Sequence, residues 1–173
     1  NIITLDIGGT SADIGVIKDF RPTEVNTGRV AKQDLAIPMT EIRTLGAGGG
    51  TIAWIGKDGL LKVGPQSAGA EPGPACYDRG GDLPTVTDAN LILGYLDPAY
   101  FLGGKLHVKP ERAQAAVEKH VAAPLGMSLT DAAAGIAHAR GPVLDDRRHG
   151  RMVAGEPVDH VVAVADVHER ILR

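Results

Sequence analysis

The chain opens with NIITLDIGGTSADIGVI (residues 1–17), and this stretch decides the fold because two apolar runs flank a turn of small and polar residues. Residues 1–5 and 13–17 predict two strands around a glycine-rich turn. A polar turn at residues 18–22 then leads into residues 23–27, which could form a third strand. Short strands joined by tight turns predict an antiparallel meander at the start of the chain.

The turn between the first two strands carries groups that suit a phosphate site. Gly8 and Gly9 let the backbone approach an anion closely and direct N–H groups at it. Thr10 and Ser11 follow and add hydroxyl donors. A Walker loop or a dinucleotide fingerprint requires a helix after the glycines, whereas a strand is predicted here. Two interpretations stay open, a phosphate-binding turn or a tight β-turn whose hydroxyls satisfy the backbone.

Carboxylates border this turn on both sides, at Asp6 and Asp13. A bare carboxylate repels phosphate, so a Mg²⁺ ion held by Asp6, directly or through water, is the natural mediator. Asp6 could instead orient an attacking water molecule. We therefore expect Asp6 and Asp13 to be the catalytic residues, with Asp6 as the metal ligand.

A second glycine segment, GAGGG at residues 46–50, follows a short predicted strand at residues 42–45. It could line a nucleotide cleft with backbone N–H groups, or form a sharp bend between strands. Four of its residues are candidates for nucleotide contact: Gly46, Gly48, Gly49 and Gly50. A hairpin is predicted next, with strands at residues 51–55 and 60–63 around an Asp-Gly turn.

Loops and helices are predicted for the rest of the chain. Residues 64–84 are rich in Gly and Pro and predict a long loop, either ordered or flexible. A short helix is expected at residues 89–93 with its N-cap within residues 87–88, and a clearer helix begins at Pro110. A further helix follows a capping box at residues 128–131. Strands first and helices afterwards predict an α+β fold.

Composition argues against several classes of function. The formal net charge is −3, with no basic stripe, which disfavours nucleic acid or an anionic membrane as a partner. No apolar run reaches the roughly 20 residues that a transmembrane helix needs. The single cysteine, Cys76, fits a reducing cytoplasm, and we expect it to be a buried structural thiol. The six histidines lack a metal-binding spacing, and we expect them at the surface.

Longer phrases of the sequence resemble one family. DIGGTSAD (residues 6–13) is similar to the nucleotide-binding turn of the actin, sugar-kinase and Hsp70 superfamily. Four further phrases resemble, in order, the hydantoinase A/5-oxoprolinase family: residues 44–54, 63–77, 85–90 and 96–104. Since the resemblance ends near residue 136, we expect a partial domain at residues 1–137 and a divergent tail at residues 138–173.

This resemblance implies an actin-like (ribonuclease H-like) ATPase fold in two halves, each with one Asp-x-Gly-Gly-Thr turn and with ATP between them. Residues 6–13 match the second turn, so the first would precede Asn1, and we expect the chain to be a fragment. Family members use ATP to phosphorylate a weakly reactive carbonyl oxygen, either to hydrolyse cyclic amides such as 5-oxoproline and hydantoins or to carboxylate ketones. A hydantoinase B-type subunit or domain commonly completes the reaction.

Three functions are therefore compatible with the sequence. The first is part of an ATP-dependent cyclic amidohydrolase, or of a ketone carboxylase of the same family. The second is a non-catalytic remnant that binds a nucleotide or a partner. The third, a sugar-kinase-like phosphotransferase, is disfavoured by the phrase at residues 64–77. We favour the amidohydrolase and expect the chain by itself to bind ATP weakly without turnover.

Overall fold

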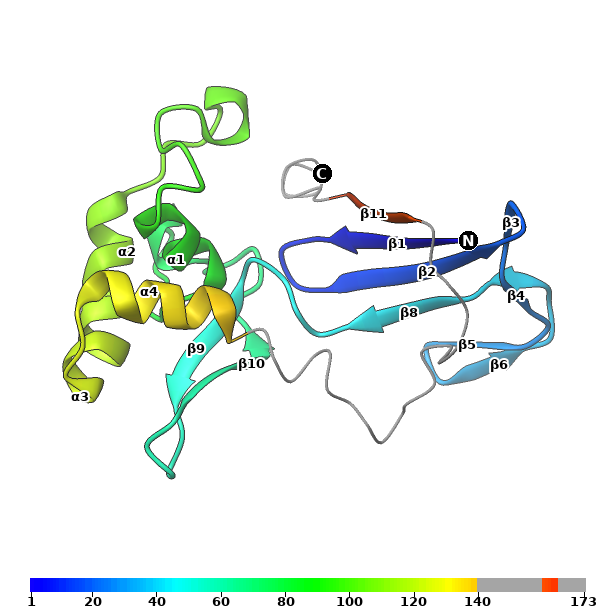
Figure 1. Cartoon of the computed structure of the whole chain (residues 1–173), viewed down its shortest axis with the longest axis horizontal. Helices are drawn as coiled ribbons and strands as arrows, with labels where there is room; N and C mark the ends of the chain where they lie inside the picture. Colours follow the sequence, from blue (N-terminus) through cyan, green and yellow to red (C-terminus); the bar gives the residue numbers. More distant parts are fainter. Residues whose placement is uncertain (140–159, 165–173) are drawn as a thin grey trace.

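The structure, a computed structural model, describes residues 1–139 and 160–164, which form a sheet and a helical part next to it (Figure 1). The first sheet is built on the hairpin of β1 (Ile2–Ile7) and β2 (Ala12–Lys18), which pair antiparallel. The turn of this hairpin points towards the helices (Figure 1). The two first predicted strands are thus confirmed, and the mixture of sheet and helices agrees with the α+β prediction.

Two more strands extend this sheet. β8 (Ile42–Leu45) pairs antiparallel with β2, as predicted for residues 42–45. On the other side, β11 (His160–Val164) pairs in parallel with β1. The sheet therefore joins segments from both ends of the sequence, and the described strand of the tail belongs to it.

The predicted third strand at residues 23–27 is confirmed only over Glu24–Val25, and it does not extend the meander. β3 (Arg21–Pro22) continues the pairing with β2, whereas β4 (Glu24–Val25) pairs with β7 (Met39–Thr40). An additional hairpin, β5 (Gly28–Val30) with β6 (Gln33–Leu35), was not predicted. Its second strand is exposed along its length, so no alternation of apolar and polar residues marks it.

The predicted hairpin after the second glycine segment is confirmed. β9 (Thr51–Ile55) pairs antiparallel with β10 (Leu61–Ser67), and Gly59 in the turn has a φ of +74°. β10 continues beyond the predicted strand end through a shift in register. The predicted loop at residues 64–84 is ordered: it starts within β10 and includes a buried 3-10 turn, η1 (Ala75–Tyr77).

The first helix, α1 (Val86–Ile92), begins earlier than predicted, because its N-cap is Thr85 and not residues 87–88. Asp88 occupies the third helical position, where its side chain completes a capping box with Thr85. After α1, a short 3-10 segment, η2 (Phe101–Gly104), leads to the second helix.

The predicted helix at Pro110 is confirmed as one continuous helical run in three parts. These are α2 (Pro110–Val117), a π-helical turn η3 (Glu118–Ala122) and α3 (Ala123–Leu125), which ends at Gly126 in the left-handed conformation. The apolar face of this run is buried at four positions: Ala113, Ala116, Val117 and Val121. Ser128 then caps α4 (Leu129–His138), as its hydroxyl accepts the N–H of Asp131 at 3.1 Å.

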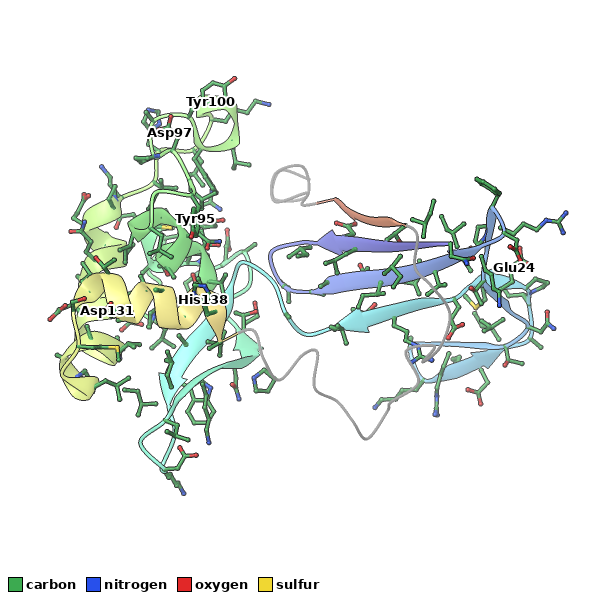
Figure 2. All side chains as sticks on the ribbon, viewed as in Figure 1. Glu24, Tyr95, Asp97, Tyr100, Asp131 and His138 are labelled. Atoms are coloured by element: carbon green, nitrogen blue, oxygen red, sulfur yellow. The ribbon has the colours of Figure 1, made fainter. Side chains whose placement is uncertain are left out.

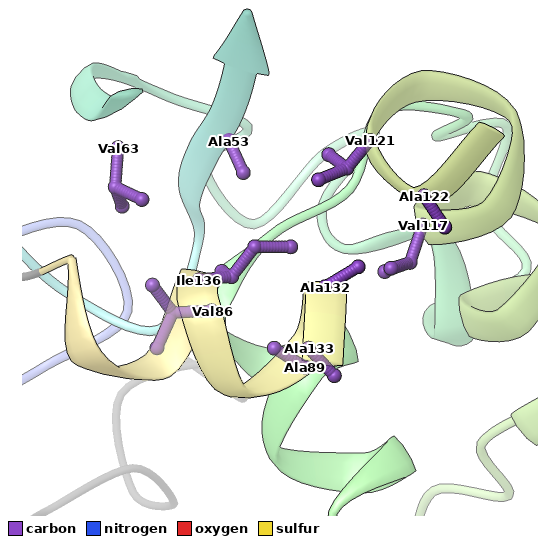
Figure 3. Close-up of a cluster of buried hydrophobic side chains, with 10 residues drawn as sticks. All are labelled: Ala53, Val63, Val86, Ala89, Val117, Val121, Ala122, Ala132, Ala133 and Ile136. Carbon is purple, nitrogen blue, oxygen red and sulfur yellow. The ribbon is translucent and has the colours of Figure 1, made fainter. Parts of the chain in front are cut away.

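The main hydrophobic core lies between the β9–β10 hairpin and the helices (Figure 3). Ile136 of α4 is fully buried in it, in a cluster that also holds side chains from both strands and from α1, α2 and η3. All other buried members are Val or Ala, so Ile136 is the largest side chain that is buried in this cluster. A second cluster lies around η1 and η2, where the rings of Tyr77 and Phe101 are 5.7 Å apart.

Ile136→Ala is expected to lower the free energy of unfolding by about 3 kcal/mol, because it leaves a cavity that small neighbours cannot fill. Urea denaturation followed by circular dichroism measures this. Leu60→Ala at the exposed hairpin tip, where the side chain is 62% exposed, is the control and should change stability by less than about 0.5 kcal/mol. Equal effects of the two variants would contradict this core.

The predicted tail is described only in part. The tail holds an apolar run at residues 158–167, of which His160–Val164 form a strand. It also holds a charged run at residues 145–151, which lies outside the described residues. The proposed boundary after residue 137 stays a prediction. Within residues 1–139 and 160–164, no helix is long and apolar enough to cross a membrane.

Candidate functional site

The turn between β1 and β2 presents backbone donors to solvent. It is closed by a hydrogen bond from the Gly8 N–H to the Ser11 carbonyl, at 2.8 Å. Gly9 and Thr10, between them, are exposed. Within the described part of the chain, the N–H groups of Gly9 and Thr10 make no hydrogen bond. Neighbouring amides without an internal acceptor in an exposed turn are groups of the kind that bind anions.

Two carboxylates face each other where this turn begins and ends. Asp6 of β1 is directly opposite Asp13 of β2 in the register of the hairpin, so both side chains lie on one face of the sheet. Cβ atoms of such a pair are about 4.5–5.5 Å apart, and like charges in this arrangement destabilise a sheet. Asp6 is exposed and Asp13 half-buried. The structure therefore brings the two predicted catalytic residues together beside the exposed amides.

A third polar residue, Thr44, extends this row and was not predicted. It is opposite Asp13 in the pairing of β2 with β8, and its hydroxyl donates to Asp13 Oδ1 at 2.5 Å. This hydrogen bond fixes the Asp13 carboxylate, whereas no such partner holds Asp6 within the described residues. Only the strand pairing reveals Thr44, because it is separated from Asp13 by 31 positions in the sequence.

The donor set suits Mg²⁺ better than a metal that needs a full protein cage. Among the described residues, no group of three or more His, Cys, Asp and Glu side chains could hold a metal ion. Mg²⁺ commonly takes one or two carboxylates and completes its shell with water and substrate phosphates. Asp6 and Asp13 beside a turn with two exposed amides fit that pattern.

The second glycine segment packs directly against the first turn. Gly49 N–H donates to the Gly8 carbonyl at 3.1 Å, and Gly50 N–H donates to the Gly9 carbonyl at 2.6 Å. Gly48 N–H donates to the buried Thr51 hydroxyl at 2.8 Å. These three amides already donate hydrogen bonds to acceptors inside the protein. This supports the interpretation of the segment as a sharp bend between strands over its interpretation as a donor of amides to phosphate. Direct nucleotide contact by Gly46, Gly48, Gly49 or Gly50 stays a prediction.

Asp88 is a structural residue, as predicted from its capping position. It is fully buried, and its carboxylate accepts four hydrogen bonds from three residues. The donors are Thr85 N–H (2.9 Å), Thr85 Oγ1 (2.8 Å), Cys76 N–H (2.8 Å) and Ala75 N–H (3.2 Å). Asp88 thereby ties η1 to the start of α1.

Cys76 and Tyr77 of η1 lie in the same buried environment. Burial, followed by the charge of Asp88, raises the pKa of the Cys76 thiol, so the thiol stays protonated and is a poor nucleophile. The prediction of a buried cysteine is confirmed. Burial also raises the pKa of Tyr77 to about 12, with Cys76 and Asp88 adding to the effect and a hydrogen bond with Thr87 opposing it.

The histidines are only partly as predicted. His107 and His138 are exposed, and His138 lies at the end of α4 (Figure 2). His120, in the π-helical turn, is half-buried, and its Nε2 has no hydrogen-bond partner among the described residues. The side chains of the remaining three lie outside the described part of the chain.

The sequence matches the model of the hydantoinase/oxoprolinase family over residues 1–142. It is 48% identical over 136 residues to the caprolactamase subunit alpha of Pseudomonas jessenii, and 39% identical over 142 residues to the acetophenone carboxylase gamma subunit of Aromatoleum aromaticum. These matches cover 79% and 78% of this chain, but only 20% and 19% of the relatives.

Solved structures give the same result. A nucleotide-free structure of an ATP-dependent acetone carboxylase aligns with a TM-score of 0.70 and 36% identity, over 79% of this chain and 19% of that one. The structure of the ATP-dependent caprolactamase from Pseudomonas jessenii aligns with a TM-score of 0.64 and 47% identity, over 78% and 20% of the two chains. The chain thus spans about a fifth of the length of these relatives.

Proposed function

The chain belongs to the hydantoinase/oxoprolinase family, and from this premise we propose that its β1–β2 turn binds the phosphates of ATP in an enzyme that hydrolyses a cyclic amide. The observation that carries the proposal is the pair of exposed amides, Gly9 and Thr10, beside the cross-strand pair Asp6 and Asp13. Thr10 and Ser11 add hydroxyl groups to the same turn. In the proposed actin-like fold this turn is the second of two phosphate turns.

The proposed chemistry uses ATP to make a poor electrophile reactive. ATP supplies a phosphoryl group to the amide carbonyl oxygen and leaves as ADP, and water then attacks the activated carbon, which yields phosphate and the ring-opened amino acid. The residues of this chain contribute position and charge, because phosphoryl transfer depends mainly on electrostatic stabilisation. Asp6 and Asp13 would hold Mg²⁺ or, for Asp6, orient the attacking water.

A partner and a location follow from the same proposal. Several relatives carry the names of subunits, which supports the existence of a partner. We propose that this partner is a hydantoinase B-type subunit or domain. The dependence on ATP and the protonated, unpaired Cys76 fit the cytoplasm.

A ketone carboxylase is the second candidate. It is favoured by the likeness to acetophenone carboxylase and to the structure of acetone carboxylase. The same phosphate turn would then serve to phosphorylate a ketone-derived enol oxygen, and bicarbonate would enter the reaction. The two candidates differ in their requirement for bicarbonate, which makes them separable by experiment.

Titration calorimetry with Mg-ATP on the complete protein that contains this chain tests the nucleotide site. We expect binding that is weakened by EDTA, and phosphate release that is stimulated by 5-oxoproline, a hydantoin or caprolactam without bicarbonate. Stimulation by acetone or acetophenone, and only with bicarbonate, would instead support the carboxylase. The 173-residue chain alone should bind weakly and show no steady turnover. Absence of Mg-ATP binding by the complete protein would refute the proposal.

A further inference from the structure

Residues 48–50 are here called the glycine clasp, and residues 8–11, between β1 and β2, the phosphate turn. The clasp holds the phosphate turn from the side opposite to its exposed amides. The clasp donates one hydrogen bond to the Gly8 carbonyl and one to the Gly9 carbonyl. These are the two carbonyl groups of the peptide units that carry the exposed N–H groups of Gly9 and Thr10.

The geometry of the peptide unit links the two sides of the turn. A trans peptide is planar, and its C=O and N–H point in opposite directions. The peptide bonds at Gly8–Gly9 and Gly9–Thr10 are both trans, since cis bonds in the described chain precede only Pro65 and Pro72. Fixing the Gly8 carbonyl towards the clasp therefore directs the Gly9 N–H away from it. The Gly9 carbonyl has the same effect on the Thr10 N–H.

The close approach of the clasp explains its glycines. A Cβ atom at position 48 would lie 2.5 Å from the Gly8 oxygen and 2.8 Å from the Gly9 oxygen. A Cβ atom at position 50 would lie 2.9 Å from the Gly9 oxygen. Both distances are too short for a real side chain, and the atoms in the way are backbone. A side chain here would displace the same two peptide units that present the donors.

The clasp is itself held by the helical part of the protein. The Gly49 carbonyl accepts the N–H of Thr87 in α1 at 2.8 Å, and the Gly50 carbonyl accepts the N–H of Ala68 at 2.8 Å. Gly48 is fixed by the buried hydroxyl of Thr51. The clasp is thus a fixed support between the first sheet and the first turn of α1.

We infer that the clasp positions the phosphate turn: the N–H groups of Gly49 and Gly50 orient the N–H groups of Gly9 and Thr10 towards bound phosphate. Gly48 is a positioning residue because only a residue without a Cβ allows this close approach. The inference rests on the proposed function of the turn and adds a role for the second glycine segment. The clasp acts behind the phosphate turn, and its own amides donate to acceptors inside the protein.

The test compares Gly48→Ala with the wild-type complete protein by titration with Mg-ATP. The dissociation constant is expected to rise at least about tenfold, because hydrogen bonds to a charged phosphate are misdirected. Hydrogen exchange adds a readout that general destabilisation does not mimic: Mg-ATP should protect amides of residues 8–11 in the wild type and not in the variant. Gly56→Ala is the matched control, since the three atoms nearest to its Cβ would be side-chain ends of Asp58 and Lys62 and not backbone.

A second variant keeps the test decisive if Gly48→Ala does not fold. Gly50→Ala introduces a milder clash and should weaken Mg-ATP roughly threefold to tenfold. Unchanged Mg-ATP affinity in a folded Gly48→Ala, or in Gly50→Ala when the former does not fold, would overturn the inference while leaving the nucleotide site intact. A wild-type protein that does not bind Mg-ATP would instead refute the proposed function.

Discussion

Asp6→Asn in the complete protein is expected to reduce ATP hydrolysis by at least two orders of magnitude. Asn keeps the shape of the side chain and removes the negative charge that would hold Mg²⁺ or orient water. Loss of one electrostatic contact to a transition state commonly lowers the rate by a factor of about 10² to 10³. Phosphate release at saturating Mg-ATP measures this effect.

The same substitution should leave the fold intact or make it slightly more stable. Asp6 faces Asp13 across the hairpin, and removal of one of two like charges relieves a repulsion of roughly 0.2–1 kcal/mol. A lower rate together with an equal or higher unfolding midpoint without nucleotide identifies a residue kept for function. Loss of both activity and stability would point to a structural role for Asp6.

Asp19→Asn is the matched control for Asp6→Asn. Asp19 is an exposed aspartate that follows β2 directly, at the end of the strand far from the phosphate turn. Asn tolerates the φ of 49° that Asp19 adopts, so the fold should be unaffected. The control should hydrolyse ATP at the wild-type rate. An unchanged rate in Asp6→Asn as well would rule out a catalytic role for Asp6.

Features of the site that depend on local sequence could be predicted, and features that depend on strand pairing could not. The turn at residues 6–13 joins two neighbouring strands, so its glycines, hydroxyls and carboxylates indicated the hairpin and the candidate donors. Thr44 and the glycine clasp reach this turn only after β8 pairs with β2. Nothing in the sequence assigns that register, and the clasp amides therefore looked available for a ligand.

Two errors in the predicted fold have local physical causes. The third strand was predicted at residues 23–27, after a turn at residues 18–22. Instead β3, within the predicted turn, pairs with β2, and β4, within the predicted strand, pairs with β7. The N-cap of α1 was placed too late because Asp88 is itself a common capping residue. The sequence did contain the correct signal, since Thr85 and Asp88 have the spacing of a capping box.

Asp88→Ala is expected to lower the free energy of unfolding by about 4 kcal/mol. The substitution leaves three buried amides and one hydroxyl without their acceptor, and each unsatisfied buried donor costs about 1–3 kcal/mol. Since domains of this size are stable by only about 5–15 kcal/mol, such a loss removes a large fraction of the stability. Chemical denaturation of the complete protein, followed over the transition that includes α1, measures it.

Two variants separate the contribution of the buried acceptor from that of capping alone. Asp88→Asn retains one acceptor oxygen and is expected to lose about 2 kcal/mol, because its NH₂ group faces a donor. Asp131→Ala removes the corresponding residue of α4, which is exposed and accepts the Ser128 hydroxyl at 2.6 Å (Figure 2). It should lose no more than about 1 kcal/mol. A similar small loss in Asp88→Ala would show that its donors find other partners.

The effect of Asp88→Ala should also reach the phosphate turn, although Asp88 is not part of it. Asp88 fixes the start of α1, and the next residue towards the N-terminus, Thr87, donates its N–H to the clasp at Gly49. Loosening this helical turn therefore weakens the support behind Gly8 and Gly9. Under conditions in which Asp88→Ala remains folded, we expect its Mg-ATP affinity to fall, while Ile136→Ala, which destabilises the core without touching the clasp, should retain wild-type affinity. Equal affinities in the two variants would mean that the clasp does not depend on the capping box of α1.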